Sequence, residues 1–193
     1  MTTNTYITTG GDMDNTVIKL GSVNISFEQL KSIIDSMPPK STIDYPNAIE
    51  TLKNGGTHSD EELNNYAKYT IEKSENYKYH DQRITDLFPD SFLIENGFDP
   101  TVKRVFVLVQ PPAAFVAPHY DQFRMANIVG RPVSRLWVAL EDSKFGQALF
   151  VENSVLTNFK AGDVYTFDNA ALHSTANAGL HNRYTMLVYT TKQ

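Results

Sequence analysis

The apolar residues in the first half of the chain recur mostly at helical spacing. Residues 27–37 carry five apolar side chains on one helical face, with a serine cap before them and a proline pair after them. A capping box predicts a second helix over 60–75, and short helical segments are expected on both sides of Pro89. Only 16–25 alternates apolar and polar residues, as a pair of short strands would. Residues 1–100 are therefore expected to form a mostly helical N-terminal layer.

The pattern changes from Thr101 onwards, where β-branched and aromatic residues gather in short runs between turn signals. Closely spaced strands of this kind are typical of a sandwich or a barrel, here an antiparallel core of about 90 residues. With no repeat, linker or low-complexity tract, 1–193 is expected to be a single domain whose β core is 101–193. The runs interpreted as strands are 102–110, 134–140, 148–153, 163–169, 171–177 and 183–190.

Composition limits the chemistry. The 193 residues include 22 acidic and 17 basic ones, a formal net charge of -5, so nucleic acid is not expected as the primary partner. No leader pattern begins the sequence and no apolar run reaches the roughly 20 residues that span a bilayer, so a cytoplasmic protein is expected. The chain has no cysteine, so any metal must be held by histidine and carboxylate groups.

One pair of such groups is His119 and Asp121 in the stretch "APHYDQF". Residues two apart in a strand project from one face, so the imidazole and the carboxylate can approach one point. The same spacing occurs at His58 and Asp60, where it precedes a capping box and is expected to be structural. Spacing alone therefore does not decide between a metal site and a histidine near an aspartate.

A metal site needs a third ligand, and the following strands offer candidates. His173 lies within the run 171–177, whereas His181 and His80 are expected to be exposed to solvent. If a hairpin is centred near Ala178, His173 lies opposite Arg183, and the two side chains share a face. His119, Asp121 and His173 would then form a facial triad of two histidines and one carboxylate, which suits Fe(II). Arg183 would bind a carboxylate of an acidic co-substrate with paired hydrogen bonds.

The ordered set of His119-x-Asp121, His173 and Arg183 resembles the 2-oxoglutarate and iron(II)-dependent oxygenase superfamily, over about the last ninety residues. The flanking stretches "VQPPAAFVAPHYD", "GQALFVE" and "FKAGDVYTFDNAALHSTANAG" resemble the corresponding segments of prolyl-hydroxylase-like members. The resemblance implies a double-stranded β-helix, a jelly roll like that of the cupins, with the three ligands on Fe(II) and Arg183 anchoring 2-oxoglutarate.

Two positions depart from the prolyl-hydroxylase pattern. Gln110 stands where such members usually have a tyrosine that contacts the oxoacid. It is at best a weak candidate contact to 2-oxoglutarate, because a strand-end glutamine is expected to be solvated. Arg183 replaces a common lysine, as in the aspartyl/asparaginyl branch, and "SRLWVAL" resembles an arginine-bearing strand of that branch. Arg135 is thus a candidate second contact to the oxoacid. Trp137 is expected to fill the core rather than to bind substrate.

The resemblance implies a dioxygenase that uses dioxygen and 2-oxoglutarate to hydroxylate an unactivated C–H bond of a peptide side chain or small molecule, releasing succinate and CO2. Two alternatives remain: a cupin-like isomerase or epimerase that uses another divalent metal, and a binding module without catalysis. The substrate is not identified by the sequence, and the residues expected to border its entrance follow the metal motif: Phe123, Arg124, Asn127 and Arg131.

Overall fold

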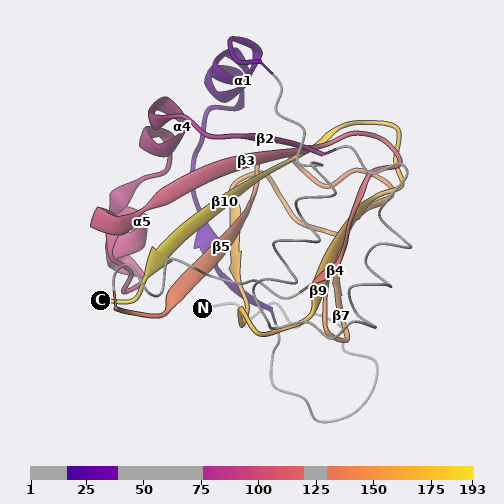
Figure 1. The fold of residues 1–193 in the computed structure, drawn as a ribbon. Coiled ribbons are helices and arrows are strands. Elements are labelled where there is room, and N and C mark those ends of the chain that lie inside the picture. The colour runs from indigo at the N-terminus through magenta and orange to yellow at the C-terminus, as the bar shows by residue number, and fades with distance from the viewer. Residues whose placement is uncertain (1–16, 39–75, 120–129) are drawn as a thin grey trace, which may run out of the picture.

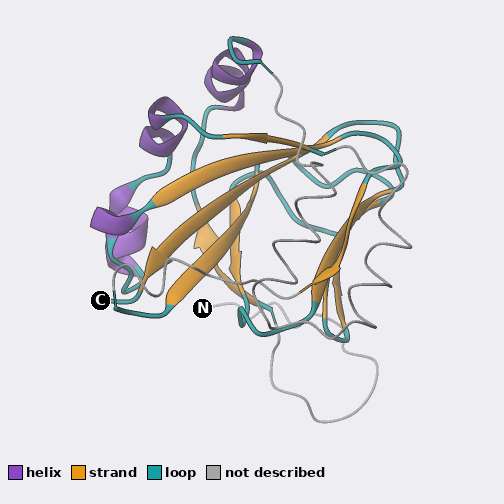
Figure 2. Cartoon of the chain, viewed as in Figure 1, coloured by secondary structure: helices purple, strands orange, loops and turns teal. Residues whose placement is uncertain are grey.

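The computed structural model describes residues 17–38, 76–119 and 130–193, drawn in colour in Figure 1. Two antiparallel sheets face each other and helices lie beside one of them (Figure 2). The six-stranded sheet has the order β1-β8-β5-β10-β3-β2, and the four-stranded sheet has the order β4-β9-β6-β7. The strands are β1 (Ile18–Ser22), β2 (Tyr77–Tyr79), β3 (Arg104–Gln110), β4 (Phe115–His119), β5 (Val133–Ala139), β6 (Gln147–Val151), β7 (Ser154–Leu156), β8 (Asp163–Thr166), β9 (His173–Asn177) and β10 (Arg183–Thr191).

The strands from β3 to β10 form a jelly roll. Along the chain, consecutive strands change sheet at every step except between β6 and β7, which pair with each other. The resulting orders, β8-β5-β10-β3 and β4-β9-β6-β7, are those of a double-stranded β-helix. The fold class expected from the sequence is therefore confirmed.

Buried side chains alternate between the two faces of the six-stranded sheet and form two hydrophobic cores, one on each face. In β3, Val105, Val107 and Val109 are buried on the outer face of the six-stranded sheet, where they pack with the helices. On the inner face, Trp137 and Tyr165 pack against residues of the four-stranded sheet such as Leu149. Trp137 is 2% exposed and meets the ring of Phe159 edge-on, so the prediction that it fills the core is confirmed.

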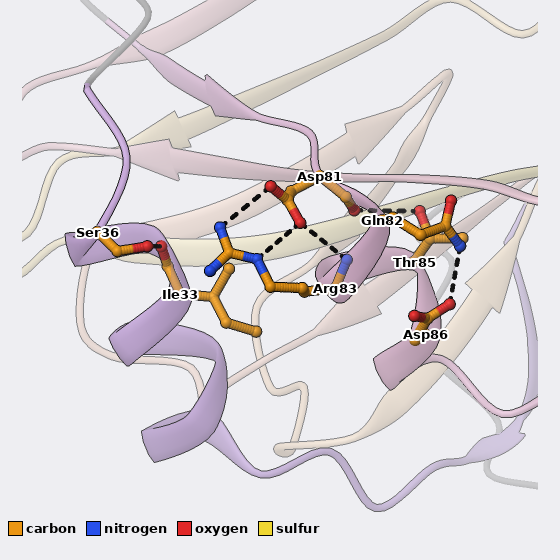
Figure 3. A network of polar contacts seen from close by, with 7 residues as sticks. All are labelled: Ile33, Ser36, Asp81, Gln82, Arg83, Thr85 and Asp86. Atoms are coloured by element: carbon orange, nitrogen blue, oxygen red, sulfur yellow. Dashed lines mark hydrogen bonds and ion pairs between the residues drawn. The ribbon is translucent and has the colours of Figure 1, made fainter.

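The helices are α1 (Phe27–Asp35), α4 (Gln82–Leu87) and α5 (Asp90–Glu95), followed by a 3-10 turn over Pro100–Val102. Ser26 caps α1 by accepting a hydrogen bond from the Gln29 amide, as the sequence predicts. Asp81 caps α4 and also accepts hydrogen bonds from the Arg83 side chain (Figure 3). The Arg83 side chain, and then its backbone amide, lower the pKa of Asp81 to about 2.

The predicted strands and helices that fall within the described residues are found, with two differences. The pair of short strands expected over 16–25 is the single strand β1, which pairs with β8 instead of with a neighbour in sequence. The strands β2 and β7 were not expected. The expected helix 60–75 lies outside the described residues, as do His58 and Asp60, so the mostly helical layer 1–100 stays a prediction. Within the ranges that the structure describes, no helix is long and apolar enough to cross a membrane.

Candidate functional site

His119 and His173 are direct cross-strand partners at adjacent ends of β4 and β9. Their ring centroids are 4.2 Å apart. The register of the two strands shifts between Val116 and His119, so a bulge lies just before the first histidine. A bulge changes the direction in which the following side chains point. After this bulge the imidazoles of His119 and His173 lie next to each other. His119 is half-buried and His173 is 4% exposed.

Asp121, the expected third ligand, lies outside the described residues. Over the described ranges, no three His, Asp or Glu side chains form a group that could hold a metal ion. The assignment of His119, Asp121 and His173 as metal ligands therefore stays a prediction, of which the structure brings together two members.

His173 has the electronic form that a metal ligand needs. Its Nδ1 lies 2.9 Å from the backbone carbonyl of Ala171, so Nδ1 carries the proton and donates it, while Nε2 keeps its lone pair. Burial lowers the pKa of His173 to about 3, with further lowering from the charges of Arg135 and His119. The ring is thus neutral at physiological pH, and Nε2 is the ring nitrogen that carries the lone pair.

Arg135 lies directly beside this nitrogen. Its Nη1 is 2.9 Å from Nε2 of His173, and its guanidinium lies over the Phe167 ring, 4.5 Å from the centroid. The side chain is 5% exposed and comes from β5, on the inner face of the six-stranded sheet. The sequence singled out Arg135 as a contact to an oxoacid, and the structure places it against His173.

Arg183 is not opposite His173, and the expected hairpin between their strands is wrong. β9 belongs to the four-stranded sheet and β10 to the six-stranded one, where Arg183 pairs with Gln110. The chain crosses between the sheets after Asn177 instead of reversing within one sheet. Gly179 in this crossing lies so close to Phe145 that an added Cβ would be 2.2 Å from its carbonyl oxygen. The glycine therefore serves the packing of two turns.

Arg183 nevertheless points into the interior. It is 2% exposed, and its Nη1 donates to the carbonyl oxygens of Ala148 at 2.6 Å and Ala176 at 3.3 Å in the opposite sheet. Its Nη2 is buried and has no hydrogen-bond partner among the described residues. Burial lowers the pKa of Arg183 to about 9. A guanidinium so placed is complementary to an anion, because its charge has no carboxylate partner among the described side chains.

Gln110 is buried at 1% exposure, so the expectation that this strand-end side chain is solvated is wrong. Its side-chain nitrogen Nε2 donates to Thr175 Oγ1 at 3.0 Å. Its side-chain oxygen Oε1 has no hydrogen-bond partner among the described residues. The end of β3 lies against β9 of the other sheet, where the Asn177 side chain donates a hydrogen bond to the Gln110 backbone oxygen.

The other histidines and the entrance residues are placed as follows. His80 and His181 are exposed, as predicted, although His80 Nδ1 is 2.8 Å from the Val105 carbonyl. Arg131 Nη1 lies 3.4 Å from Asp99 Oδ2, and its assignment to the substrate entrance stays a prediction. The remaining expected entrance residues, Phe123, Arg124 and Asn127, lie outside the described part of the chain.

Sequence reasoning missed the inward-facing row of β3. The alternation in "RVFVLVQ" was visible, with Val105, Val107 and Val109 on one face, and it leaves Arg104 and Phe106 on the other. The sequence does not indicate which face of β3 points toward the histidines, because both faces of this strand carry apolar residues.

Comparison with protein-family models gives no match for this sequence, and comparison with curated proteins gives none. Among solved structures, the chain is similar to a predicted oxalate decarboxylase from Thermotoga maritima, with 18% identity over 62% of this chain and 83% of that one, at a TM-score of 0.39. It is similar to a cupin 2 conserved barrel protein from Salinispora arenicola, with 17% identity over 61% of this chain and 76% of that one, at a TM-score of 0.36. A cupin 2 domain of an XRE family transcriptional regulator from Enterobacter cloacae gives 13% identity over 61% and 98%, at a TM-score of 0.40. The assignment of the fold rests on the strand order of the two sheets and not on these likenesses.

Proposed function

We propose that this protein is an Fe(II)- and 2-oxoglutarate-dependent dioxygenase that hydroxylates an unactivated C–H bond of a peptide side chain or small molecule. The observation that carries the proposal is the cross-strand pair of His119 and His173, with rings 4.2 Å apart inside a jelly roll. Asp121, two residues after His119, would complete a ligand set that leaves coordination positions open.

The histidine pair fits a divalent metal on its own chemistry. The Nδ1 of His173 is held by the Ala171 carbonyl, which fixes the ring and makes Nε2 the atom that would bind a metal in place of its 2.9 Å contact with Arg135 Nη1. Its pKa of about 3 means that the metal does not compete with a proton above mildly acidic pH. Iron bound there would supply dioxygen activation coupled to the oxidative decarboxylation of 2-oxoglutarate.

The interior also fits an acidic co-substrate. Arg183 is a buried cation with Nη2 unpaired among the described residues, and Thr185 Oγ1 lies 3.3 Å from its Nε. A carboxylate can accept from such a guanidinium in paired, charge-assisted hydrogen bonds. In this proposal Arg183 anchors the distal carboxylate of 2-oxoglutarate, Arg135 is a second cation near its other end, and buried Gln110 contributes an amide beside Arg183.

The test is anaerobic titration of chelator-treated protein with Fe(II), followed by 2-oxoglutarate. Chelation comes first because Ni(II), Cu(II) and Zn(II) bind nitrogen and oxygen ligands more tightly than Fe(II). We expect one metal per chain and a weak visible charge-transfer band when 2-oxoglutarate is added. Succinate should then form in air with a substrate from a peptide and metabolite panel, in which mass spectrometry detects the gain of one oxygen. Absence of both the band and succinate would refute the proposal.

Variants separate the parts of the site. Asp121→Ala should abolish metal binding, whereas Arg183→Met should keep the metal and weaken 2-oxoglutarate binding roughly 100-fold, the size of a lost charge-assisted pair. His181→Gln is the matched control, because His181 is exposed and lies outside the histidine pair. Equal loss of metal in all three variants would indicate unfolding and not a site.

One observation favours a second candidate, a binding module without metal. Arg135 Nη1 already lies at hydrogen-bond distance from the only lone pair of the His173 ring. A guanidinium at that position can replace a metal as the cation that the interior presents to an anionic ligand. This candidate predicts that 2-oxoglutarate binds equally well with chelator and with Fe(II), which calorimetry in both conditions would reveal.

A further inference from the structure

Arg183 and Gln110 are direct cross-strand partners on β10 and β3. Opposed residues on antiparallel strands share a face and have Cβ atoms about 5 Å apart. The two side chains also end on successive residues of β9 in the other sheet. Arg183 Nη1 donates to the Ala176 carbonyl at 3.3 Å, and Gln110 Nε2 donates to Thr175 Oγ1 at 3.0 Å. The two side chains therefore cross the interior side by side.

Each of these side chains keeps one polar atom that has no hydrogen-bond partner among the described residues. The two atoms are Arg183 Nη2, which is a donor, and Gln110 Oε1, which is an acceptor. The side chains are 2% and 1% exposed. A buried polar atom without a partner is costly, and the cost is removed when a bound molecule supplies the partner. Arg183 and Gln110 thus present a donor and an acceptor to one small chemical group.

The Gln110 amide is held with its oxygen turned away from β9. Its Nε2 has two acceptors on Thr175, the hydroxyl oxygen at 3.0 Å and the backbone carbonyl oxygen at 3.5 Å. The reverse orientation of the amide would set Oε1 against that carbonyl oxygen, and two acceptors repel each other. The unsatisfied atom of Gln110 is therefore the acceptor, and it requires a hydrogen-bond donor on the bound molecule.

Arg183, in contrast, requires an anion. Its pKa of about 9 leaves the guanidinium charged at pH 7.5, and no ion pair among the described residues includes it. A carboxylate that accepts from Nη2 would balance this buried charge. A carboxylate alone carries no donor, however, so it would leave Gln110 Oε1 unsatisfied.

A hydroxyl group on the carbon next to the carboxylate supplies the missing donor. An ammonium group at the same place could also donate to Gln110 Oε1. It would lie beside the Arg183 cation at a buried position, where like charges repel each other strongly. The neutral hydroxyl avoids this repulsion and is therefore the better complement to the pair.

We infer that Arg183 and Gln110 together bind a 2-hydroxy carboxylate, whose carboxylate accepts from Arg183 Nη2 and whose hydroxyl donates to Gln110 Oε1. The inference rests on the proposed function for placing an acidic co-substrate at Arg183, and it makes Gln110 the residue that distinguishes among such acids. The co-substrate that this pair favours is 2-oxoglutarate with a hydroxyl group beside its distal carboxylate. Unmodified 2-oxoglutarate binds in the same position and leaves Gln110 Oε1 without a donor.

The experiment measures the binding of four acids to the full chain at pH 7.5, by calorimetry or ligand-observed NMR. Metal is removed beforehand on a chelating resin, because a soluble polycarboxylate chelator would compete with the acids. The probes are glutarate, the two enantiomers of 2-hydroxyglutarate, and glutamate, which all have the carbon chain length of 2-oxoglutarate. We expect one enantiomer of 2-hydroxyglutarate to bind about tenfold more tightly than glutarate, the effect of one buried hydrogen bond. Glutamate should bind more weakly than that enantiomer, because its ammonium group meets Arg183.

Two variants of Gln110 localise the preference for the hydroxy acid. Gln110→Leu removes the acceptor, so the preference should disappear while glutarate binds at least as tightly as to the wild type. Gln110→Glu places a carboxylate beside Arg183 and should weaken all four acids by more than about tenfold. The control Gln82→Leu removes an exposed glutamine of α4 and should keep the wild-type preference. The preference is a ratio of affinities within one protein sample, so a partial loss of folded variant does not change it.

Equal affinity of glutarate and both enantiomers of 2-hydroxyglutarate would overturn the inference, as would absence of binding by all four acids. A preference that persists in Gln110→Leu would overturn the role of Gln110, and glutamate as the tightest ligand would overturn the assignment of a neutral donor. Failure of the iron titration leaves these measurements intact, because they are made without metal. Conversely, loss of the preference would not alter the iron and 2-oxoglutarate band, so the two proposals fail separately.

Discussion

Acidification should destabilise the metal-free protein through His173. The histidine is buried beside Arg135 and His119, and its pKa in the folded protein is about 3, against about 6.5 in an unfolded chain. Between these values the unfolded state binds a proton that the folded state does not, so stability falls as pH falls from about 6.5 toward 3. Above the unfolded pKa both states are neutral and the contribution is complete. At pH 5.0, about 1.5 pH units below the unfolded pKa, the loss is about 2 kcal/mol, at 1.36 kcal/mol per unit.

The assay is urea unfolding in chelator at pH 7.5 and pH 5.0. Other groups also titrate in this interval. The informative quantity is therefore the loss of unfolding free energy between pH 7.5 and pH 5.0, compared between wild type and His173→Gln. The loss should be smaller by about 2 kcal/mol in the variant, whatever its absolute stability, because the variant lacks the titrating group. His181→Gln, which removes an exposed histidine, should retain the wild-type loss. The same pH-dependent loss in His173→Gln as in wild type would refute the assignment of a buried neutral imidazole.

Two further predictions concern the packing that holds the sheets in place. Gly162→Ala should cost about 3 kcal/mol in urea unfolding, because φ is +85° and an added Cβ would lie 2.1 Å from the Val23 carbonyl oxygen. Gly97→Ala, with φ of +73° and nothing within 4 Å, should cost only about 1 kcal/mol, and equal costs would contradict the steric argument. Asp163→Ala should cost about 3 kcal/mol, since it removes a buried carboxylate that pairs with Lys19 at 2.7 Å and accepts hydrogen bonds from Tyr165 Oη and the Lys160 amide. Lys19→Met should cost less than Asp163→Ala, because the buried carboxylate then keeps the hydrogen bonds from Tyr165 Oη and the Lys160 amide, and the reverse order would refute the argument.

The strands and helices could be predicted because their signals are local. In β3 the alternation of Val105, Val107 and Val109 with other residues identifies a strand regardless of its neighbours. The cap at Ser26 likewise depends on residues within one turn of α1. Short strands with weak alternation, such as β2 and β7, lack such a signal, and their pairing with β3 and β6 stabilises them only in the folded protein.

The relation of His173 to Arg183 could not be predicted, because it depends on which sheet each strand joins. Strands consecutive in sequence often pair, and an Ala-Gly turn between them favours a hairpin, so the sequence predicted that the two residues oppose each other. In a jelly roll the same short connection crosses between sheets. The partner of Arg183 is then Gln110, more than 70 residues away in sequence, and no local signal identifies it.

The crossing also restricts what the interior can bind. The interior has two polar levels along the strands. At one level the Arg183 guanidinium donates to the Ala148 and Ala176 carbonyls. At the other level, three or more residues along the strands, lie the His173 ring and Arg135. Between these levels the inner face carries apolar groups such as Leu187 and Trp137. At about 3.3 Å per residue, three residues of strand separate the two polar levels by about 10 Å, which is more than a monoacid such as acetate can bridge. A ligand that engages both levels must be elongated and anionic at both ends with an apolar middle, which describes a short-chain dicarboxylate. This physical requirement favours 2-oxoglutarate over a monocarboxylic oxoacid as the co-substrate of the proposed reaction.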